Sequence, residues 1–264
     1  MSDWTTIAAE IAAAGAHPFA PDPPRSVGGG CINSAYVLRD GDRSYFVKVN
    51  RADLLSMFEA EAAGLGEMAA TRTIRVPSPL CTGVAGSQAY IVMEYLPMGG
   101  RAGGGAARAG RQLAAMHQTA RSDFGWDRDN TIGSTPQPNC PDPDWLAFWR
   151  ERRLGFQLQL AARKGYGGRL QSLGERLLAD FPALIDHDPR PSLLHGDLWG
   201  GNMGFDRQGE PVIFDPAVYY GDREADLAMT ELFGGFGADF YAAYDEAWPL
   251  DRGYRVRQTL YNLY

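Results

Sequence analysis

The chain has 264 residues, which is enough for one large domain or two modest domains with a proper hydrophobic core. Hydrophobic residues make up 45% of the sequence and charged residues 22%, as in ordinary soluble globular proteins. The net charge of -7 argues against a protein dedicated to binding nucleic acid or an anionic membrane. The sequence has no secretion signal and no apolar run of about 18 residues, so we expect a cytoplasmic protein without membrane or nucleic-acid partners.

Cysteine spacing excludes two further kinds of protein. The three cysteines, Cys31, Cys81 and Cys140, are widely separated, and no two of them form a Cys-x-x-Cys pair. This spacing predicts neither a disulfide framework nor a zinc site, and it is typical of proteins in a reducing compartment.

Residues 3–14 have the apolar spacing of a helix, and residues 26–49 have the pattern of strands separated by turns. Three glycines, Gly28, Gly29 and Gly30, form a loop between these strands. Such glycines let main-chain N–H groups approach phosphate oxygens without obstruction from side chains. A glycine run is more often a plain loop, and the spaced Gly-x-Gly-x-x-Gly pattern of protein kinases is missing here. The hairpin pattern that follows the glycines is what favours a phosphate-binding loop.

Lys48 lies in the second strand of that hairpin, in Phe46-Val47-Lys48-Val49. The chain contains 23 arginines and only two lysines, Lys48 and Lys164. A sequence that otherwise uses arginine has lysine where a compact point charge would be needed against the α- and β-phosphates of a nucleotide. A surface role is commoner for any single lysine, but position and scarcity together favour phosphate binding.

A helical pattern over residues 52–70 offers two carboxylates, Glu59 and Glu61, as partners for Lys48. At about 100° per residue, Glu61 lies nearer the centre of the apolar stripe than Glu59 does. We therefore predict a Lys48–Glu61 ion pair. The alternative is that both carboxylates lie on a solvated face of the helix.

Two strands are predicted over residues 80–84 and 89–93, and a short extended link follows them. A link of this kind can present main-chain N–H and C=O groups to the edge of adenine. The predicted adenine site consists of Met93, Glu94, Tyr95 and Leu96.

The glycine-rich stretch 99–105 is the best candidate boundary between two lobes. Helical patterns dominate after it, over residues 106–118, 142–164, 168–186, 238–247 and 251–264. The polar segment 124–139 has the composition of either a functional loop or a plain surface loop. We therefore predict an α+β, bilobal fold. Residues 1–98 form a small lobe with an antiparallel sheet, and residues 99–264 form a larger, mainly helical lobe. The apolar pattern still runs at Tyr264, so we expect the natural chain to extend further.

The stretch from Leu193 to Asp215 holds the candidate catalytic groups. Asp197 and Asn202 are five residues apart, which is the Asp-to-Asn spacing of the kinase catalytic loop, and Asp215 ends an apolar strand, where kinases have a magnesium-binding carboxylate. A hydroxyl that attacks a γ-phosphate needs a proton acceptor, which Asp197 can be, and Mg²⁺ prefers hard oxygen ligands, which Asn202 and Asp215 can supply. Asp, Asn and Gly are also common turn formers, but this spacing followed by a strand and an aspartate favours the catalytic interpretation.

With these parts in place, the chain resembles the fructosamine (ketosamine) kinase family, whose fold is protein-kinase-like and close to that of the aminoglycoside phosphotransferases. The resemblance covers nearly the whole chain from about Gly28. Its most specific words are Gly28-Gly29-Gly30-Cys31-Ile32-Asn33, Asp129-Asn130-Thr131-Ile132-Gly133-Ser134-Thr135-Pro136-Gln137-Pro138-Asn139 and His195-Gly196-Asp197-Leu198-Trp199-Gly200-Gly201-Asn202.

The resemblance implies ATP- and Mg²⁺-dependent phosphorylation of a sugar hydroxyl of a ketosamine, either a small molecule or a modified lysine of a protein. Asp197 would be the proton acceptor, Asn202 and Asp215 would hold Mg²⁺, and Lys48 would hold phosphates. Trp199 and His195 are candidate substrate contacts, because Trp199 stands where protein kinases commonly have lysine and a flat apolar platform suits a sugar ring.

The chain also departs from protein kinases. Asp215 is followed by Pro216-Ala217 rather than Phe-Gly, and no Ala-Pro-Glu closes an activation segment, so we expect no phosphorylation-ordered loop. Two alternatives stay open: a kinase for another hydroxylated amine, such as an aminoglycoside or choline, and an inactive nucleotide-binding pseudokinase. The intact set of Lys48, Asp197, Asn202 and Asp215 argues against the second.

Cys31 follows the three glycines of the proposed phosphate loop. Main-chain N–H groups that attract phosphate also stabilise a thiolate, so Cys31 is a candidate for reversible oxidation. The alternative is a small apolar residue packed under the loop. If the thiol is reactive, the protein is expected to be a monomer that can form a redox-linked dimer through Cys31.

Overall fold

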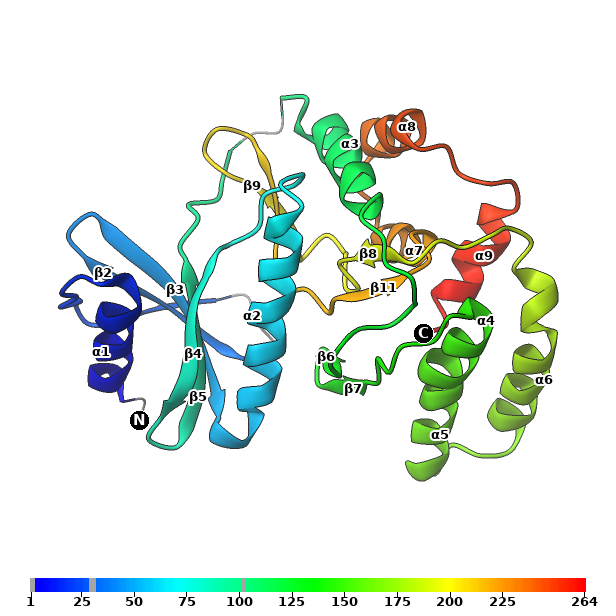
Figure 1. The fold of residues 1–264 in the computed structure, drawn as a ribbon, viewed down its shortest axis with the longest axis horizontal. Helices are drawn as coiled ribbons and strands as arrows, with labels where there is room; N and C mark the ends of the chain where they lie inside the picture. The colour runs from blue at the N-terminus through cyan, green and yellow to red at the C-terminus, as the bar shows by residue number, and fades with distance from the viewer. Residues whose placement is uncertain (1–2, 29–31, 101–102) are drawn as a thin grey trace.

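The computed structural model describes residues 3–28, 32–100 and 103–264 (Figure 1). Helix α1, Trp4–Gly15, begins where the Asp3 side chain accepts a hydrogen bond of 3.1 Å from the main-chain N–H of Thr6. Such a cap satisfies a main-chain N–H that has no partner in the first turn of a helix. The helix buries Ile7 and Ile11 against the sheet that follows it.

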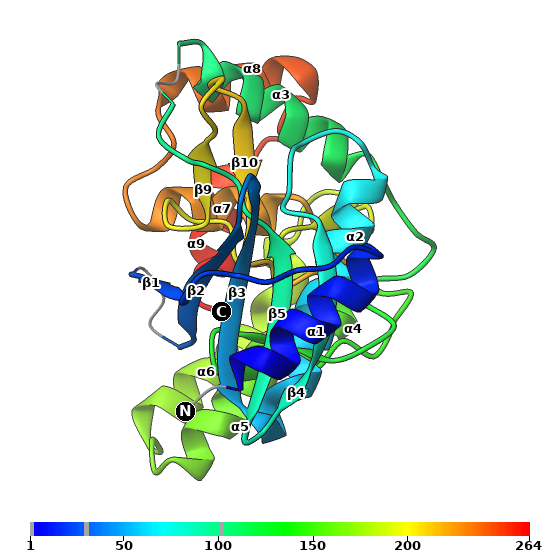
Figure 2. The same ribbon diagram turned by 90° about the vertical axis from the view of Figure 1, so that its left-hand side faces the viewer.

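The N-terminal part of the chain forms a five-stranded antiparallel sheet with the strand order β1-β2-β3-β5-β4. The strands are β1 (Arg25–Val27), β2 (Ser34–Asp40), β3 (Arg43–Arg51), β4 (Pro79–Ala85) and β5 (Gln88–Glu94). A short 3-10 helix, Ala52–Leu54, leads into helix α2, Leu55–Ala70, which covers the opposite face of the sheet from α1 (Figures 1 and 2).

Alternation along the central strands decides which side chains face the rest of the molecule. Successive residues of a strand point to opposite faces of the sheet. Val47 and Val49 pack in the cluster beneath α1, whereas Phe46 packs against the main core on the other face. Lys48 lies between the two valines and therefore points away from α1, toward α2 and the remainder of the chain.

The C-terminal part, over its described residues, is mainly helical, with three two-stranded sheets between its helices. The helices are α3 (Gly105–His117), α4 (Trp145–Phe148), a π-helical segment (Trp149–Leu154), α5 (Gly155–Arg163), α6 (Arg169–Leu184), α7 (Glu224–Leu232), α8 (Ala238–Ala247) and α9 (Tyr254–Tyr261). The antiparallel pairs are β6 (Asn130–Ile132) with β7 (Thr135–Gln137), β8 (Ser192–Leu194) with β11 (Tyr219–Gly221), and β9 (Met203–Phe205) with β10 (Pro211–Ile213). The predicted α+β architecture, with an antiparallel sheet followed by a mainly helical part, is confirmed, and the boundary at residues 98 and 99 stays a prediction.

The predicted helix over residues 142–164 begins later than expected. Its first helical residue is Trp145, and Asp144 accepts a hydrogen bond of 2.9 Å from the main-chain N–H of Leu146. Pro143 accounts for the difference, because a residue before a proline disfavours helical geometry and Asp144 is a good N-cap. The helix also contains the π-helical segment, which no pattern in the sequence predicts.

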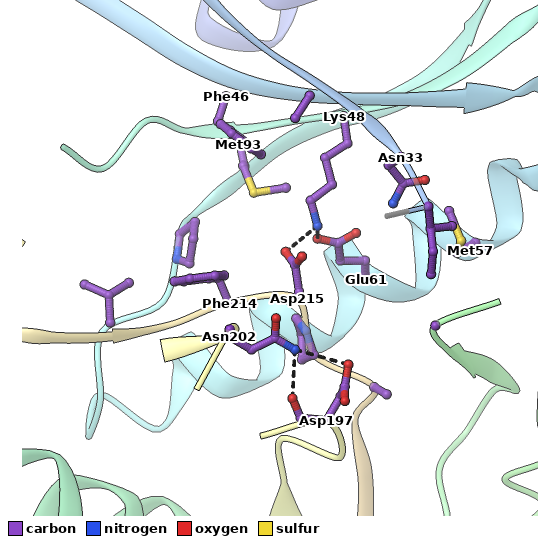
Figure 3. Close-up of a pocket in the computed structure, with 18 of the residues that line it drawn as sticks. Asn33, Phe46, Lys48, Met57, Glu61, Met93, Asp197, Asn202, Phe214 and Asp215 are labelled. Carbon is purple, nitrogen blue, oxygen red and sulfur yellow. Dashed lines mark hydrogen bonds and ion pairs between the residues drawn. The ribbon is translucent and has the colours of Figure 1, made fainter. Parts of the chain in front are cut away.

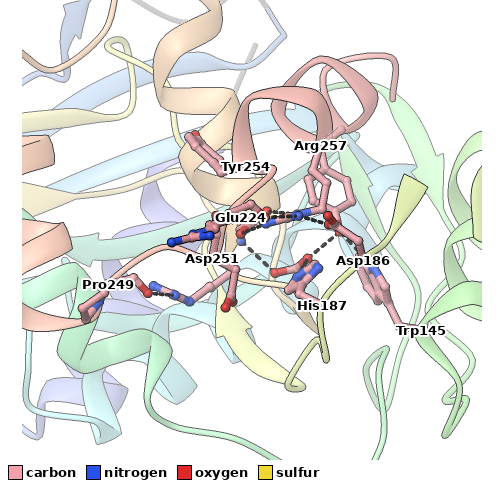
Figure 4. A network of polar contacts seen from close by, with 12 residues as sticks. Trp145, Asp186, His187, Glu224, Pro249, Asp251, Tyr254 and Arg257 are labelled. Carbon is pink, nitrogen blue, oxygen red and sulfur yellow. Dashed lines mark hydrogen bonds and ion pairs between the residues drawn. The ribbon is translucent and has the colours of Figure 1, made fainter. Parts of the chain in front are cut away.

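A buried polar network fastens the C-terminal helix to α7 (Figure 4). The fully buried guanidinium of Arg257 donates to both carboxylate oxygens of Glu224, at 2.6 and 2.8 Å. Asp222 lies 2.8 Å from the Nε2 of His187 and accepts a hydrogen bond from the hydroxyl of Tyr261. His187, Asp222 and Glu224 could in principle surround a metal ion, but Arg257 and Tyr261 already satisfy the two carboxylates, so we interpret the cluster as structural.

One hydrophobic core continues from α2 into the helical part, joining Phe58 and Leu65 of α2 to Leu193, Leu198 and Val218. Main-chain contacts also cross this junction, since the N–H of Ile213 donates to the oxygen of Arg75 at 3.0 Å. Among the described residues, we find no helix with the length and apolar character that crossing a membrane requires.

Candidate active site

A cleft of about 700 Å³ lies between the sheet and the helical part of the molecule. Its lining includes eleven of the residues predicted from the sequence: Gly28, Lys48, Glu61, Met93, Glu94, Tyr95, Leu96, Asp197, Trp199, Asn202 and Asp215. Gly29, Gly30 and Cys31 lie outside the described residues, so the predictions for them stay predictions. The fold therefore brings together residues from five separate stretches of the chain.

Lys48 is buried and lies at the centre of a charge cluster (Figure 3). Its Nζ lies 2.6 Å from Oε1 of Glu61 and also forms an ion pair with Asp215. Burial opposes the charge on Lys48, but the two neighbouring carboxylates outweigh it and raise the pKa of the lysine, which therefore stays protonated. Glu59 is exposed, so the predicted choice of Glu61 as the partner of Lys48 is confirmed.

Asn202 closes the loop that carries Asp197. Its Nδ2 donates to the main-chain oxygen of Asp197 at 2.8 Å and to Oδ2 of the same residue at 3.1 Å. The five-residue spacing seen in the sequence is thus the span of a loop whose ends are joined by one side-chain amide. The main chain of Asn202 is fixed as well, because its N–H donates to Trp199 at 2.9 Å and its oxygen accepts from Phe214 at 3.0 Å.

The carboxyl of Asp197 has a pKa raised to about 7. Burial is the largest cause, and the negative charges of Asp215 and Asp226 add to it, while the hydrogen bond from Asn202 acts in the opposite direction. A carboxylate whose pKa lies near neutral pH is well matched to accepting a proton during a reaction at that pH.

Asp226, on α7, anchors the main chain just before Asp197. Its carboxylate accepts from the N–H of His195 at 2.7 Å and from the N–H of Gly196 at 2.8 Å, and it lies 3.2 Å from Nε2 of His117. Burial opposes its charge, but these contacts hold the pKa of Asp226 below its ordinary value. Asp226 is therefore a structural anchor for the catalytic loop.

Gly196 permits a close contact that no larger residue could make. Its φ is 81°, in the left-handed region that favours glycine, and a Cβ there would lie 2.0 Å from the main-chain oxygen of Ala217. The catalytic loop therefore packs directly against the segment that follows Asp215.

His195 does not contact the cleft, which corrects the prediction that it meets the substrate. The side chain is completely buried, with Nε2 3.0 Å from the main-chain oxygen of Phe214 and Nδ1 3.3 Å from the N–H of Asp197. This pattern requires a neutral ring that donates from Nε2 and accepts at Nδ1, and burial lowers the pKa of His195 accordingly. His195 links the strand end before Asp215 to the loop of Asp197.

The arrangement of Asn202 and Asp215 fits a magnesium ion. Because the Nδ2 of Asn202 is turned toward Asp197, its Oδ1 points toward the carboxylate of Asp215 (Figure 3). Asp215 has a φ of 59°, an uncommon left-handed conformation that aspartate tolerates better than most residues and that turns its side chain into the cleft. A carboxylate and an amide oxygen are hard donors of the kind that Mg²⁺ uses, with its remaining ligands from water and phosphate.

At the predicted adenine end of the cleft, one of the expected main-chain donors already has a partner within the protein. The side chain of Glu94 pairs with Arg75, and its main-chain N–H already donates to the oxygen of Ser78 at 2.8 Å. The N–H of Glu94 is therefore not a free donor for adenine, and the other predicted contacts of the adenine site stay predictions.

Sequence reasoning missed the role of three buried amides around β6 and β7. Asn130 donates to the oxygen of Val218 at 2.8 Å, Gln137 donates to Ala217 at 3.0 Å, and Asn139 donates to Oδ1 of Asn130 at 2.8 Å. They hold the main chain just after Asp215, and Asn130 also lines the cleft. The polarity of residues 124–139 did not distinguish this brace from a plain surface loop, and the resemblance of residues 129–139 to the family did not indicate what the amides contact.

Comparisons with known proteins agree with this geometry. The family model described as fructosamine kinase matches residues 3–264. The chain is 50% identical over 262 residues to a probable ketoamine kinase of Synechocystis sp., covering 99% of this chain and 88% of that protein. It is 47% identical over 244 residues to a chloroplastic protein-ribulosamine 3-kinase of Arabidopsis thaliana, covering 90% of this chain and 74% of that protein.

Solved structures give the same result for the fold. A crystal structure named as a fructosamine-3-kinase from Haemophilus somnus has a TM-score of 0.91 and 32% identity, and covers 99% of this chain and 88% of that one. An aminoglycoside-3'-phosphotransferase of type VIII, at 21% identity and a TM-score of 0.58 over 92% of this chain and 93% of that one, shares the fold. The predicted protein-kinase-like fold is thereby confirmed. The chain belongs to the fructosamine kinase family.

Proposed function

We propose that this protein is an ATP-dependent kinase that phosphorylates a sugar hydroxyl of a ketosamine, free or attached to a protein lysine. The observation that carries the proposal is the convergence of Lys48, Glu61, Asp197, Asn202 and Asp215 on one cleft. Membership of the family and the names of its relatives, a ketoamine kinase and a protein-ribulosamine 3-kinase, support ketosamines as the substrate class.

Asp197 is the group that accepts the proton of the attacking hydroxyl. Its pKa of about 7 lets the carboxylate be unprotonated at neutral pH while remaining basic enough to accept a proton in the transition state. Asn202 holds this carboxylate in one orientation through the 3.1 Å contact to Oδ2, which aims it at an in-line attack on the γ-phosphate.

Lys48 and Asp215 are the groups that bind the nucleotide and its metal ion. The protonated amine of Lys48, held by Glu61, attracts the α- and β-phosphates. Asn202 and Asp215 are the residues that would hold Mg²⁺, through Oδ1 and the carboxylate. When bound, the metal ion neutralises charge on the phosphate oxygens during transfer.

Trp199 is the proposed platform for the sugar. It lines the cleft two residues after Asp197, and the residue is 39% exposed. Its ring is supported at an edge by Phe233, with 5.6 Å between the ring centroids. A flat apolar surface stacks well on a sugar ring, whereas it offers no charge to a peptide or to a phosphate.

The same observations support the competing functions less well. A kinase for an aminoglycoside or choline would share the nucleotide chemistry, so the acceptor must be decided by experiment. An inactive nucleotide-binding pseudokinase would not need both a carboxylate with a raised pKa at Asp197 and an amide that orients it.

The deciding experiment is a coupled ADP-release screen over ribulosamines, fructosamines, aminoglycosides, choline and a Ser/Thr peptide, with ATP and Mg²⁺. We expect turnover with a ketosamine and none with the peptide. The Asp197→Asn variant is the control for background hydrolysis, and Trp199→Ala should raise KM for the ketosamine without changing KM for ATP. Turnover confined to aminoglycosides, choline or peptide, or no turnover with any acceptor, would overturn the proposal.

We further propose a cytoplasmic monomer that can form a disulfide-linked dimer through Cys31. The support comes from the sequence, because Cys31 lies outside the described residues. Wild type and Cys31→Ala are oxidised side by side, assayed and run on a non-reducing gel. Inhibition and a reducible dimer in wild type only are the expected results, and equal inhibition of both proteins would leave Cys31 with a packing role.

A further inference from the structure

We propose that Glu67 of α2 is a positioning residue for ATP binding. Glu67 fixes α2 along the segment that carries Asp215 and thereby holds Glu61 against Lys48. The roles of Glu61 and Lys48 rest on the proposed function, whereas the contacts of Glu67 are independent of it. Glu67 itself does not line the cleft, and no pattern in the sequence distinguished it from other helix carboxylates.

The carboxylate of Glu67 accepts hydrogen bonds from three residues in the helical part of the molecule. Its Oε2 accepts from Nε1 of Trp126 at 2.6 Å, and its Oε1 accepts from the hydroxyl of Tyr220 and from Arg121, both at 2.7 Å. The Arg121 guanidinium also lies over the Tyr220 ring, 4.5 Å from its centroid. Hydrogen bonds to an ionised carboxylate are among the stronger contacts available to a protein, and three of them on one side chain fix its position.

Glu67 is the last of three residues on α2 that follow one another at intervals of three, a spacing that places neighbours on one side of a helix. The three are Glu61, Gly64 and Glu67. Each of them is connected to a residue that follows β10, in the same order along the chain. Glu61 is linked to Asp215 through Lys48, which pairs with both. Gly64 packs against Val218, and Glu67 accepts a hydrogen bond from Tyr220.

Gly64 allows α2 to pack closely against Val218. A Cβ at this position would lie 2.8 Å from Cγ2 of Val218, so only glycine lets the helix approach the segment at this distance. The helix therefore has close packing at Gly64 and directional hydrogen bonds one turn later at Glu67. Packing alone permits small rotations of a helix, whereas three hydrogen bonds to one carboxylate define its rotation.

The position of Glu61 depends on that rotation. Six residues separate Glu61 from Glu67, which is roughly 9 Å along a helix axis. Because a helix moves as a rigid unit over this distance, releasing Glu67 lets α2 turn and weakens the 2.6 Å contact between Glu61 and Lys48. These ties lie within the chain, so the ion pair can assemble without a phosphorylated activation segment.

Loss of Glu67 should leave the fold intact. Phe58 and Leu65 still bury α2 in the main core, and the main-chain contact between Ile213 and Arg75 still joins the two parts of the molecule. The variant can therefore be purified and its nucleotide binding compared with that of wild type.

The first experiment measures affinity for a non-hydrolysable ATP analogue with Mg²⁺, by calorimetry and without an acceptor. We expect Glu67→Ala to weaken binding about tenfold, a coupling typical between linked sites. Glu67→Gln should be intermediate, because it keeps one acceptor oxygen, and Glu59→Ala, an exposed carboxylate of the same helix, should bind as wild type does. Unchanged affinity in Glu67→Ala would overturn the proposal.

The second experiment separates positioning from general stabilisation. In a Glu61→Ala background, adding Glu67→Ala should cause little further loss of ATP affinity, although it should lower the melting temperature by the same amount as in wild type. Hydrogen exchange in the free protein should be faster over residues 55–70 in Glu67→Ala. Additive losses of affinity, or unchanged exchange in α2, would make Glu67 a structural residue only. Because neither measurement uses an acceptor, a wild type that binds ATP without phosphorylating a ketosamine would refute the proposed function and leave this inference standing.

Discussion

The Nδ2 of Asn202 lies 2.8 Å from the main-chain oxygen of Asp197 and 3.1 Å from its carboxylate. One amide thus closes the catalytic loop and orients the side chain at its centre. The same geometry leaves Oδ1 of Asn202 directed toward Asp215 (Figure 3). A single residue therefore contributes to both halves of the proposed chemistry, proton acceptance on one side and metal binding on the other.

Replacing Asp197 by asparagine should lower kcat by about 10²–10⁴-fold and leave ATP affinity nearly unchanged. The substitution keeps the size of the side chain but removes its negative charge and its ability to accept a proton. Steady-state kinetics and calorimetry on a variant with a wild-type circular dichroism spectrum provide the check. Near-normal turnover in that variant would exclude Asp197 as the base.

The value of kcat/KM should rise as the pH increases through about 7, because Asp197 accepts a proton only when it is ionised and its pKa is raised to about 7. The residual activity of Asp197→Asn should lack this transition. A wild-type profile that is flat from about pH 5 to 8 would contradict the assignment.

Lys48 and Glu61 should behave as one unit in nucleotide binding. Lys48→Ala is expected to raise KM for ATP and lower kcat/KM, and adding Glu61→Ala should cost little more, because the second change removes a partner that is already lost. Steady-state kinetics on the two single variants and the double variant complete the cycle. Glu59→Ala is the matched control on the same helix, and strictly additive losses for Lys48 and Glu61 would show that the ion pair does not act in binding.

His195→Ala should destabilise the protein by about 1–3 kcal/mol, because it leaves the buried oxygen of Phe214 and the N–H of Asp197 without their partner. We expect a lower kcat with little change in KM for the ketosamine, since the ring positions Asp197 and does not touch the cleft. Thermal unfolding and steady-state kinetics test this, with the exposed His17→Ala as control. An increase in KM alone, with unchanged stability, would restore His195 as a substrate contact.

Much of the candidate site could be predicted because its signals are local. The spacing of Asp197 and Asn202 is the span of one loop, and the placement of Lys48 follows from the two-residue period of a strand. The choice of Glu61 over Glu59 followed from helix periodicity, and the 2.6 Å contact with Lys48 confirms it.

Predictions failed or were missing where a side chain's role depends on distant partners. His195 stands in the most informative motif of the chain, yet its ring is buried against Phe214, 19 residues away. The amides of Asn130 and Gln137 donate to main-chain oxygens 88 and 80 residues away, and the local sequence pattern does not reveal these partners.

By itself, the sequence determined which residues could accept a proton, bind phosphate or bind a metal, because those properties belong to residue types and to short-range spacing. Only the tertiary structure decided which of them share a cleft and what holds them there. Glu67 and Tyr220 are 153 residues apart in the chain, and their hydrogen bond of 2.7 Å exists only because α2 packs against the segment after Asp215. Local periodicity places a carboxylate on a helix face, but packing between distant segments decides which donors that face meets.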